Sequence, residues 1–129
     1  MSPVKLIFVD DDPDDRDLIN EGLVTLGADN FLVLDSGKSL FATLDSLKSG
    51  KLPEAIVLDL NMPEMGGMDI LKQLKATSEY QNISVYILTT SAAPTFKQQC
   101  INAGAAGYYT KPNSLIELNS ILNELYDAV

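Results

Sequence analysis

Carboxylates stand directly after two apolar runs of this sequence. The acidic run Asp10–Asp12 follows Leu6–Val9, and Asp59 follows Ala55–Leu58. Carboxylates that are brought close together repel one another, so either some of them are protonated or a cation joins them. Because the chain has no histidine and a single cysteine, we expect a hard cation with oxygen ligands: Mg²⁺, with Mn²⁺ or Ca²⁺ as stand-ins.

A hydroxyl and an ammonium elsewhere in the chain would complete a site for phosphate chemistry. Thr89 follows the apolar run Val85–Leu88, and Lys111 precedes Pro112. A carboxylate beside Mg²⁺ can attack phosphorus as a nucleophile and form an acyl phosphate. The charge on the moving phosphoryl group is then met by the metal, an ammonium and a hydroxyl donor. We expect Asp59, Lys111 and Thr89 to supply the carboxylate, the ammonium and the hydroxyl.

Short apolar runs predict the strands that position these groups. Three of the runs lack the alternation of apolar and polar residues, which is typical of strands buried on both faces of a parallel sheet. The five predicted strands are Leu6–Val9, Phe31–Leu34, Ala55–Leu58, Val85–Leu88 and Ala106–Tyr109. An apolar stripe at helical spacing follows each strand and is expected to face the core. The stripes are Leu18, Ile19, Leu23 and Leu26; Leu40, Phe41, Leu44 and Leu47; Ile70, Leu71 and Leu74; Phe96, Cys100 and Ala103; and Leu115, Leu118, Leu122 and Leu125.

This alternation of strand and helix predicts the fold. With right-handed crossovers it gives an α/β, doubly wound, five-stranded parallel sheet of flavodoxin-like strand order 2-1-3-4-5. Ligands of such sheets bind beyond the carboxyl ends of the strands, beside the first strand. We therefore expect the acidic run, Asp59, Thr89 and Lys111 to share one crevice.

Two local features flank this crevice. The acidic side chains that open the first helix favour its positive end and are expected to be solvated, with the first of them as the N-cap: Asp12, Asp14, Asp15 and Asp17. The pair Gly66-Gly67 is expected to serve a tight turn into the third helix, where a positive φ or a close backbone approach is needed.

The composition bounds the function. The chain has 129 residues and no obvious repeat, so we expect a single domain over residues 1–129 and no output domain. A net charge of −9 repels phosphate backbones and anionic lipid, so neither nucleic acid nor membrane is an expected partner. No apolar run is long enough to span a bilayer, and the start MSPVKLIFVDDD lacks the pattern of a signal peptide, which predicts a cytoplasmic location.

Over its whole length the chain resembles the receiver domain of bacterial two-component response regulators, in particular the stand-alone, chemotaxis-regulator-like members. The matching motifs are FVDDDPDDRDLI, IVLDLNMPEMGG, ILTTSA and AGAAGYYTKP. Four motifs in the family's order and spacing make the match specific, and no core position departs from the pattern. The resemblance implies a protein that catalyses only its own phosphoryl transfer and slow dephosphorylation, and that is not otherwise an enzyme.

The resemblance assigns a metal site and a phosphorylation site. Asp59 would be the aspartate that accepts the phosphoryl group. Mg²⁺ would be bound by Asp10, Asp11 and Asp59, with Asp11 a direct ligand and Asp10 acting more through water. Asn61 would give its backbone carbonyl to the metal.

The resemblance also assigns a switch. Thr89 would bind a phosphoryl oxygen, and Lys111 would pair with the phosphoryl charge. Tyr108 would be the aromatic residue whose inward or outward rotamer follows the Thr89 hydroxyl. Phosphorylation would then shift the population towards one arrangement of the protein surface.

Two kinds of partner follow from the resemblance. Because the chain has no histidine, the phosphoryl donor would be a sensor histidine kinase or a histidine phosphotransfer protein. A downstream protein would bind the helix after Pro94, the strand Ala106–Tyr109 and the helix after Ser114, and the chain would be a monomer or a weak homodimer. The connection 49–54 and the run Thr89–Ser91 further resemble stand-alone receivers that include partners of bacterial phytochromes.

A calcium-binding loop of the EF-hand type fits part of the acidic run. Four side chains match its ligand positions: Asp10, Asp12, Asp14 and Glu21. However, Asp15 stands where the loop requires glycine, Pro13 lies inside it, and a strand precedes it instead of a helix. We reject this function.

Two other phosphate-binding classes are excluded by single features. A phosphatase of the haloacid dehalogenase type would use Asp10 and Asp12 in a D-x-D arrangement, but Asp14 stands where Thr or Val should follow. Such a phosphatase would be labelled on Asp10 and turn over many substrates, whereas a receiver is labelled once, on Asp59. A flavodoxin needs a phosphate-cradling loop after the first strand, and six aspartates between residues 10 and 17 would repel that phosphate.

Overall fold

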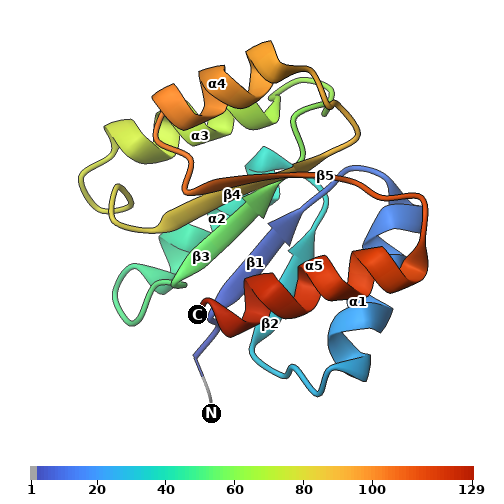
Figure 1. Cartoon of the computed structure of the whole chain (residues 1–129). Coiled ribbons are helices and arrows are strands. Elements are labelled where there is room, and N and C mark those ends of the chain that lie inside the picture. Colours follow the sequence, from blue (N-terminus) through green and yellow to red (C-terminus); the bar gives the residue numbers. More distant parts are fainter. Residues whose placement is uncertain (1–2) are drawn as a thin grey trace.

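The computed structural model describes residues 3–129 as alternating strands and helices (Figure 1). The five strands are β1 (Leu6–Val9), β2 (Phe31–Leu34), β3 (Ala55–Leu58), β4 (Ser84–Thr89) and β5 (Gly107–Thr110). The five helices are α1 (Pro13–Thr25), α2 (Gly37–Leu47), α3 (Gly67–Ala76), α4 (Pro94–Asn102) and α5 (Leu115–Asp127). No helix among these residues is both long and apolar enough to cross a membrane.

The strands form one parallel sheet in the order β2-β1-β3-β4-β5, which confirms the predicted doubly wound fold. In the register of β1 and β3, Val9 lies opposite Leu58, so the residues after them, Asp10 and Asp59, leave the sheet at the same level. The Asp59 amide donates to the Val9 carbonyl at 3.1 Å. The sheet therefore carries its carboxylates to one edge.

The helices cover both faces of the sheet and bury two apolar clusters. Helices α2, α3 and α4 lie on one face, and α1 and α5 lie together on the other (Figure 1). Strand residues alternate between the clusters, so Ile7 packs under α2 and α3 while Phe8 packs under α1 and α5. Burial of this kind contributes about 25 cal/mol per Å² of apolar surface and stabilises the sheet and its helices as one unit.

Two predicted core positions are wrong. Phe96 is 47% exposed and Leu115 is 58% exposed, although each continues an apolar stripe. Both stand in the first turn of their helices, α4 and α5, where neighbouring elements cover only part of each side chain. Cys100, further along α4, is fully buried, as predicted, and burial raises the pKa of its thiol.

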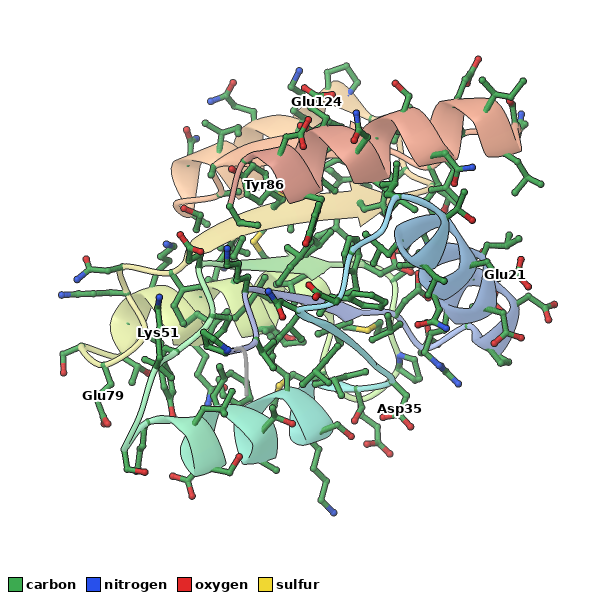
Figure 2. All side chains as sticks on the ribbon, turned by 90° about the horizontal axis from the view of Figure 1, so that it is seen from below. Glu21, Asp35, Lys51, Glu79, Tyr86 and Glu124 are labelled. Atoms are coloured by element: carbon green, nitrogen blue, oxygen red, sulfur yellow. The ribbon has the colours of Figure 1, made fainter. Side chains whose placement is uncertain are left out.

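Figure 2 shows on which side of the molecule the strands have their carboxyl ends. In Figure 2, Asp35 lies on the side of the molecule where Glu21 of α1 lies, and Lys51 and Glu79 lie on the opposite side. Asp35 directly follows β2, so its side marks the carboxyl ends of the strands. The candidate chemistry gathers at this end.

Candidate functional site

Three of the predicted carboxylates converge after β1 and β3. Asp10 and Asp59 are 2% and 6% exposed, and Asp11 borders them at intermediate exposure. One carboxylate oxygen from each of the three lies within 4.8 Å of the others. The donor set consists of hard oxygen atoms with a strong excess of negative charge, so it fits a divalent cation such as Mg²⁺ or Mn²⁺.

Within the described residues, the positive charge that contacts this carboxylate cluster is the ammonium group of Lys111. Its Nζ lies 2.7 Å from Asp10 Oδ2, 2.8 Å from Asp15 Oδ2 and 3.0 Å from Asp59 Oδ2. Burial by itself would lower the pKa of Lys111, but the hydrogen bonds with Asp10, Asp15 and Asp59 outweigh it and raise that pKa. The lysine is therefore charged throughout the physiological range and partly offsets the carboxylates.

The backbone around Asp10 fixes its side chain. Asp10 Oδ1 accepts the Asp12 amide at 3.0 Å, and the Asp10 carbonyl accepts Arg16 Nη1 at 2.9 Å. Burial raises the pKa of Asp10, although its hydrogen bonds with Lys111 and Asp12 act in the opposite direction. The role of Arg16 could not be predicted from the sequence, because a single arginine on a helix carries no local signal of its partner.

Asp59 is held between its own loop and the start of α3. Asp59 Oδ1 accepts the amide of Asn61 at 3.2 Å, while Oδ2 faces Lys111. The Asn61 residue is exposed. Gly67, the first residue of α3, packs so closely that a Cβ there would lie 2.2 Å from the Asp59 carbonyl oxygen. This confirms the close backbone approach that the Gly66-Gly67 pair predicted.

The predicted switch residues are placed by β4 and β5. Thr89 ends β4 and is fully buried, yet its Oγ1 has no hydrogen-bond partner among the described residues. Tyr108 is partly buried, and its hydroxyl donates to the Ser91 carbonyl at 2.7 Å. The structure thus holds the Tyr108 hydroxyl on the loop after β4, and it leaves the Thr89 hydroxyl without a hydrogen-bond partner among the described residues.

Replacing Thr89 by valine is expected to raise the free energy of unfolding by about 1 kcal/mol, because a buried unpartnered hydroxyl is lost and the branched shape is kept. Urea unfolding without metal would measure it. The control is Thr110→Val on the neighbouring strand, where Thr110 pairs with Thr89 but is exposed, and stability should change by less than about 0.5 kcal/mol. A loss of stability in Thr89→Val would contradict the unpartnered state of the hydroxyl.

Comparisons with known proteins agree with this geometry. The family model of the response regulator receiver domain matches residues 6–123 of this chain. Chemotaxis protein CheY-3 of Vibrio cholerae is 31% identical, over 98% of this chain and 94% of that protein. Two solved structures are similar in fold. The Mn²⁺-bound form of response regulator Rcp1 has a TM-score of 0.82 and 28% identity, and the match covers 95% of this chain and 91% of that one. The phosphorylated cyanobacterial phytochrome response regulator RcpA has a TM-score of 0.84 and 25% identity, and the match covers 98% of this chain and 93% of that one.

Proposed function

The chain belongs to the response regulator receiver domain family, and on that premise we propose that Asp59 accepts a phosphoryl group from a partner phosphohistidine in a Mg²⁺-dependent reaction. Receiver domains are modules of two-component signal transduction that act with histidine kinases and downstream targets. The observation that carries the proposal is the contact of Asp59 Oδ2 with Lys111 Nζ at 3.0 Å, beside the carboxylates of Asp10 and Asp11. A nucleophile, an ammonium and a cation site then share one crevice.

The chemistry forms one bond and breaks another. A carboxylate oxygen of Asp59 attacks the phosphorus of the donor, so a P–O bond forms while the P–N bond to the donor imidazole breaks. The imidazole nitrogen leaves with the electron pair and takes a proton from solvent. In the later hydrolysis, water attacks the phosphorus, and phosphate and the Asp59 carboxylate are released.

The residues around Asp59 would stabilise the negative charge of the phosphoryl group. Mg²⁺ held by Asp10, Asp11, Asp59 and the Asn61 carbonyl would supply positive charge to the phosphoryl oxygens. Lys111 stays within reach of the new phosphoryl group and pairs with its charge, as its present contact with Asp59 Oδ2 supports. Electrostatic stabilisation of this kind is a large term in phosphoryl transfer.

Thr89 and Tyr108 would convert the new charge into a change of surface. The buried Thr89 hydroxyl lacks a partner among the described residues, so a phosphoryl oxygen offers it a hydrogen bond that the unmodified protein does not. Moving Thr89 towards that oxygen changes the space beside Tyr108, whose hydroxyl is bound by Ser91 in this structure. Phosphorylation then favours one arrangement of the loop after β4.

We infer that the output is a protein contact on α4, β5 and α5. Exposed apolar side chains support this surface, with Ile101 on α4 and Ile116 on α5 being 41% and 84% exposed. The donor would be a sensor histidine kinase or a histidine phosphotransfer protein, because the chain has no histidine. The oligomeric state (a monomer or weak homodimer), the cytoplasmic location and the single domain over residues 1–129 stay predictions.

The proposal is tested by incubating the protein with acetyl phosphate, with Mg²⁺ or with excess EDTA, and recording its intact mass. One phosphoryl group per chain is expected with Mg²⁺ and none with EDTA. The adduct should form once per molecule and decay slowly, whereas turnover of many donor molecules would favour a phosphatase. No adduct from acetyl phosphate or from a phosphorylated histidine kinase would refute the proposal.

A further inference from the structure

Asp15 behaves differently from the other acidic residues that open α1. Its Oδ2 lies 2.8 Å from Lys111 Nζ, across 96 positions of the sequence. Its side chain is 31% exposed, whereas its neighbour Asp14 is exposed and its carboxylate makes no hydrogen bond or ion pair within the described residues. The expectation that Asp15 is a solvated helix-start residue is therefore wrong.

The surroundings strengthen the contact between Asp15 and Lys111. Both side chains line a small cleft whose other walls are mainly apolar. Those walls are formed by Leu18, Ile19, Leu88, Pro112 and Leu118. Apolar walls lower the local dielectric, so this ion pair is stronger than one on the open surface.

Lys111 has as many N–H donors as it has carboxylate partners. An ammonium carries three N–H groups, and the partners are Asp10, Asp15 and Asp59. Asp10 and Asp59 also belong to the three-carboxylate cluster that suits a divalent cation, whereas Asp15 does not. A divalent cation and the Lys111 ammonium therefore compete for the carboxylates of Asp10 and Asp59. Asp15 is the carboxylate partner of Lys111 for which the cation does not compete.

We propose that Asp15 is a positioning residue that retains the Lys111 ammonium when a divalent cation takes over Asp10 and Asp59. Without Asp15, a cation entering the cluster would leave a mostly buried ammonium unpaired or leave Lys111 on the metal ligands, and either outcome weakens metal binding. This inference rests on the proposed function, since the cation is the one that phosphorylation of Asp59 needs. Asp15 thus acts on the metal through Lys111.

The experiment compares two variants that remove the same charge from the same turn of α1. Asp15→Asn is expected to weaken binding of Mn²⁺ and Mg²⁺ about tenfold, and Asp14→Asn about twofold or less. Free Mn²⁺ is counted by electron paramagnetic resonance, and Mg²⁺ binding is followed by calorimetry at about 0.15 M salt, where interactions through solvent are screened. Thermal unfolding of both variants checks that they are folded.

Repeating the measurement in a protein that lacks the Lys111 ammonium shows whether Asp15 affects Mn²⁺ binding through Lys111. In the Lys111→Met protein, Asp15→Asn should weaken Mn²⁺ binding no more than Asp14→Asn does. Equal effects of Asp15→Asn and Asp14→Asn in the natural background would overturn the inference, as would an undiminished effect of Asp15→Asn in the Lys111→Met protein. If the unmutated protein takes no phosphoryl group while the Mn²⁺ results hold, the proposed function fails and the role of Asp15 in metal binding stands.

Discussion

Asp59→Asn is expected to abolish phosphorylation and, in the absence of metal, to raise the free energy of unfolding by about 1 kcal/mol. The first effect follows because an amide oxygen is a poor nucleophile and cannot form an acyl phosphate. The second follows from the charge balance of the site, where Lys111 is shared by the carboxylates of Asp10, Asp15 and Asp59.

The gain in stability has a direct basis in the contacts. The charge of Asp59 is one of the factors that raise the pKa of Asp10, after burial, which means that the two carboxylates repel each other across the site. Asparagine keeps the volume of Asp59 and an amide oxygen that can accept from Lys111 in the place of Oδ2. Lys111 keeps two carboxylate partners, so removing the third relieves repulsion without leaving the ammonium unpaired.

The two readouts are an intact-mass assay with acetyl phosphate and urea unfolding in EDTA. Asp35→Asn is the matched control, because Asp35 follows β2 at the same end of the sheet but is exposed and interacts with Ser39. It should be phosphorylated like the unmutated protein. An adduct on Asp59→Asn would overturn the assignment of the phosphorylated residue, and a fall in its stability would contradict the repulsion between Asp10 and Asp59.

The strands and their order could be predicted because the signals are local. Short apolar runs bounded by turn residues predicted β1, β2 and β3 with the bounds that the structure has, and parallel topology then places the residues after them at one edge. Asp10, Asp59 and Lys111 therefore meet as the strand ends predict.

The sequence does not reveal features that depend on how elements meet in space. The contact of Asp15 with Lys111 joins two distant segments, and both residues have ordinary solvated roles when considered singly. Helical periodicity likewise predicts an apolar stripe but not how much of it other elements cover, and Phe96 and Leu115 are exposed although each continues such a stripe. Such features require the packing of α1, α4 and α5 to be known.

Gly67→Ala is expected to lower the free energy of unfolding by about 3 kcal/mol, because the added methyl group meets backbone and not a flexible side chain. The Cβ would lie 2.2 Å from the Asp59 carbonyl oxygen, 2.8 Å from the Asp59 carbonyl carbon and 3.0 Å from Leu60 Cα. Either α3 must move away from β3 or the Asp59 backbone must shift.

A shift of the Asp59 backbone would also disturb the reaction. Displacing a reacting group by about 1 Å can cost about a hundredfold in rate, so phosphorylation of Gly67→Ala by acetyl phosphate should slow by about that factor. Urea unfolding and time-resolved intact mass measure the two effects. The control is Gly50→Ala, where the nearest atom to the added methyl group is the Leu47 carbonyl oxygen at an ordinary 3.8 Å and neither quantity should fall. If Gly67→Ala behaved like Gly50→Ala, α3 would be free to retreat, and the close packing of Gly67 would not be what fixes Asp59 beside Lys111.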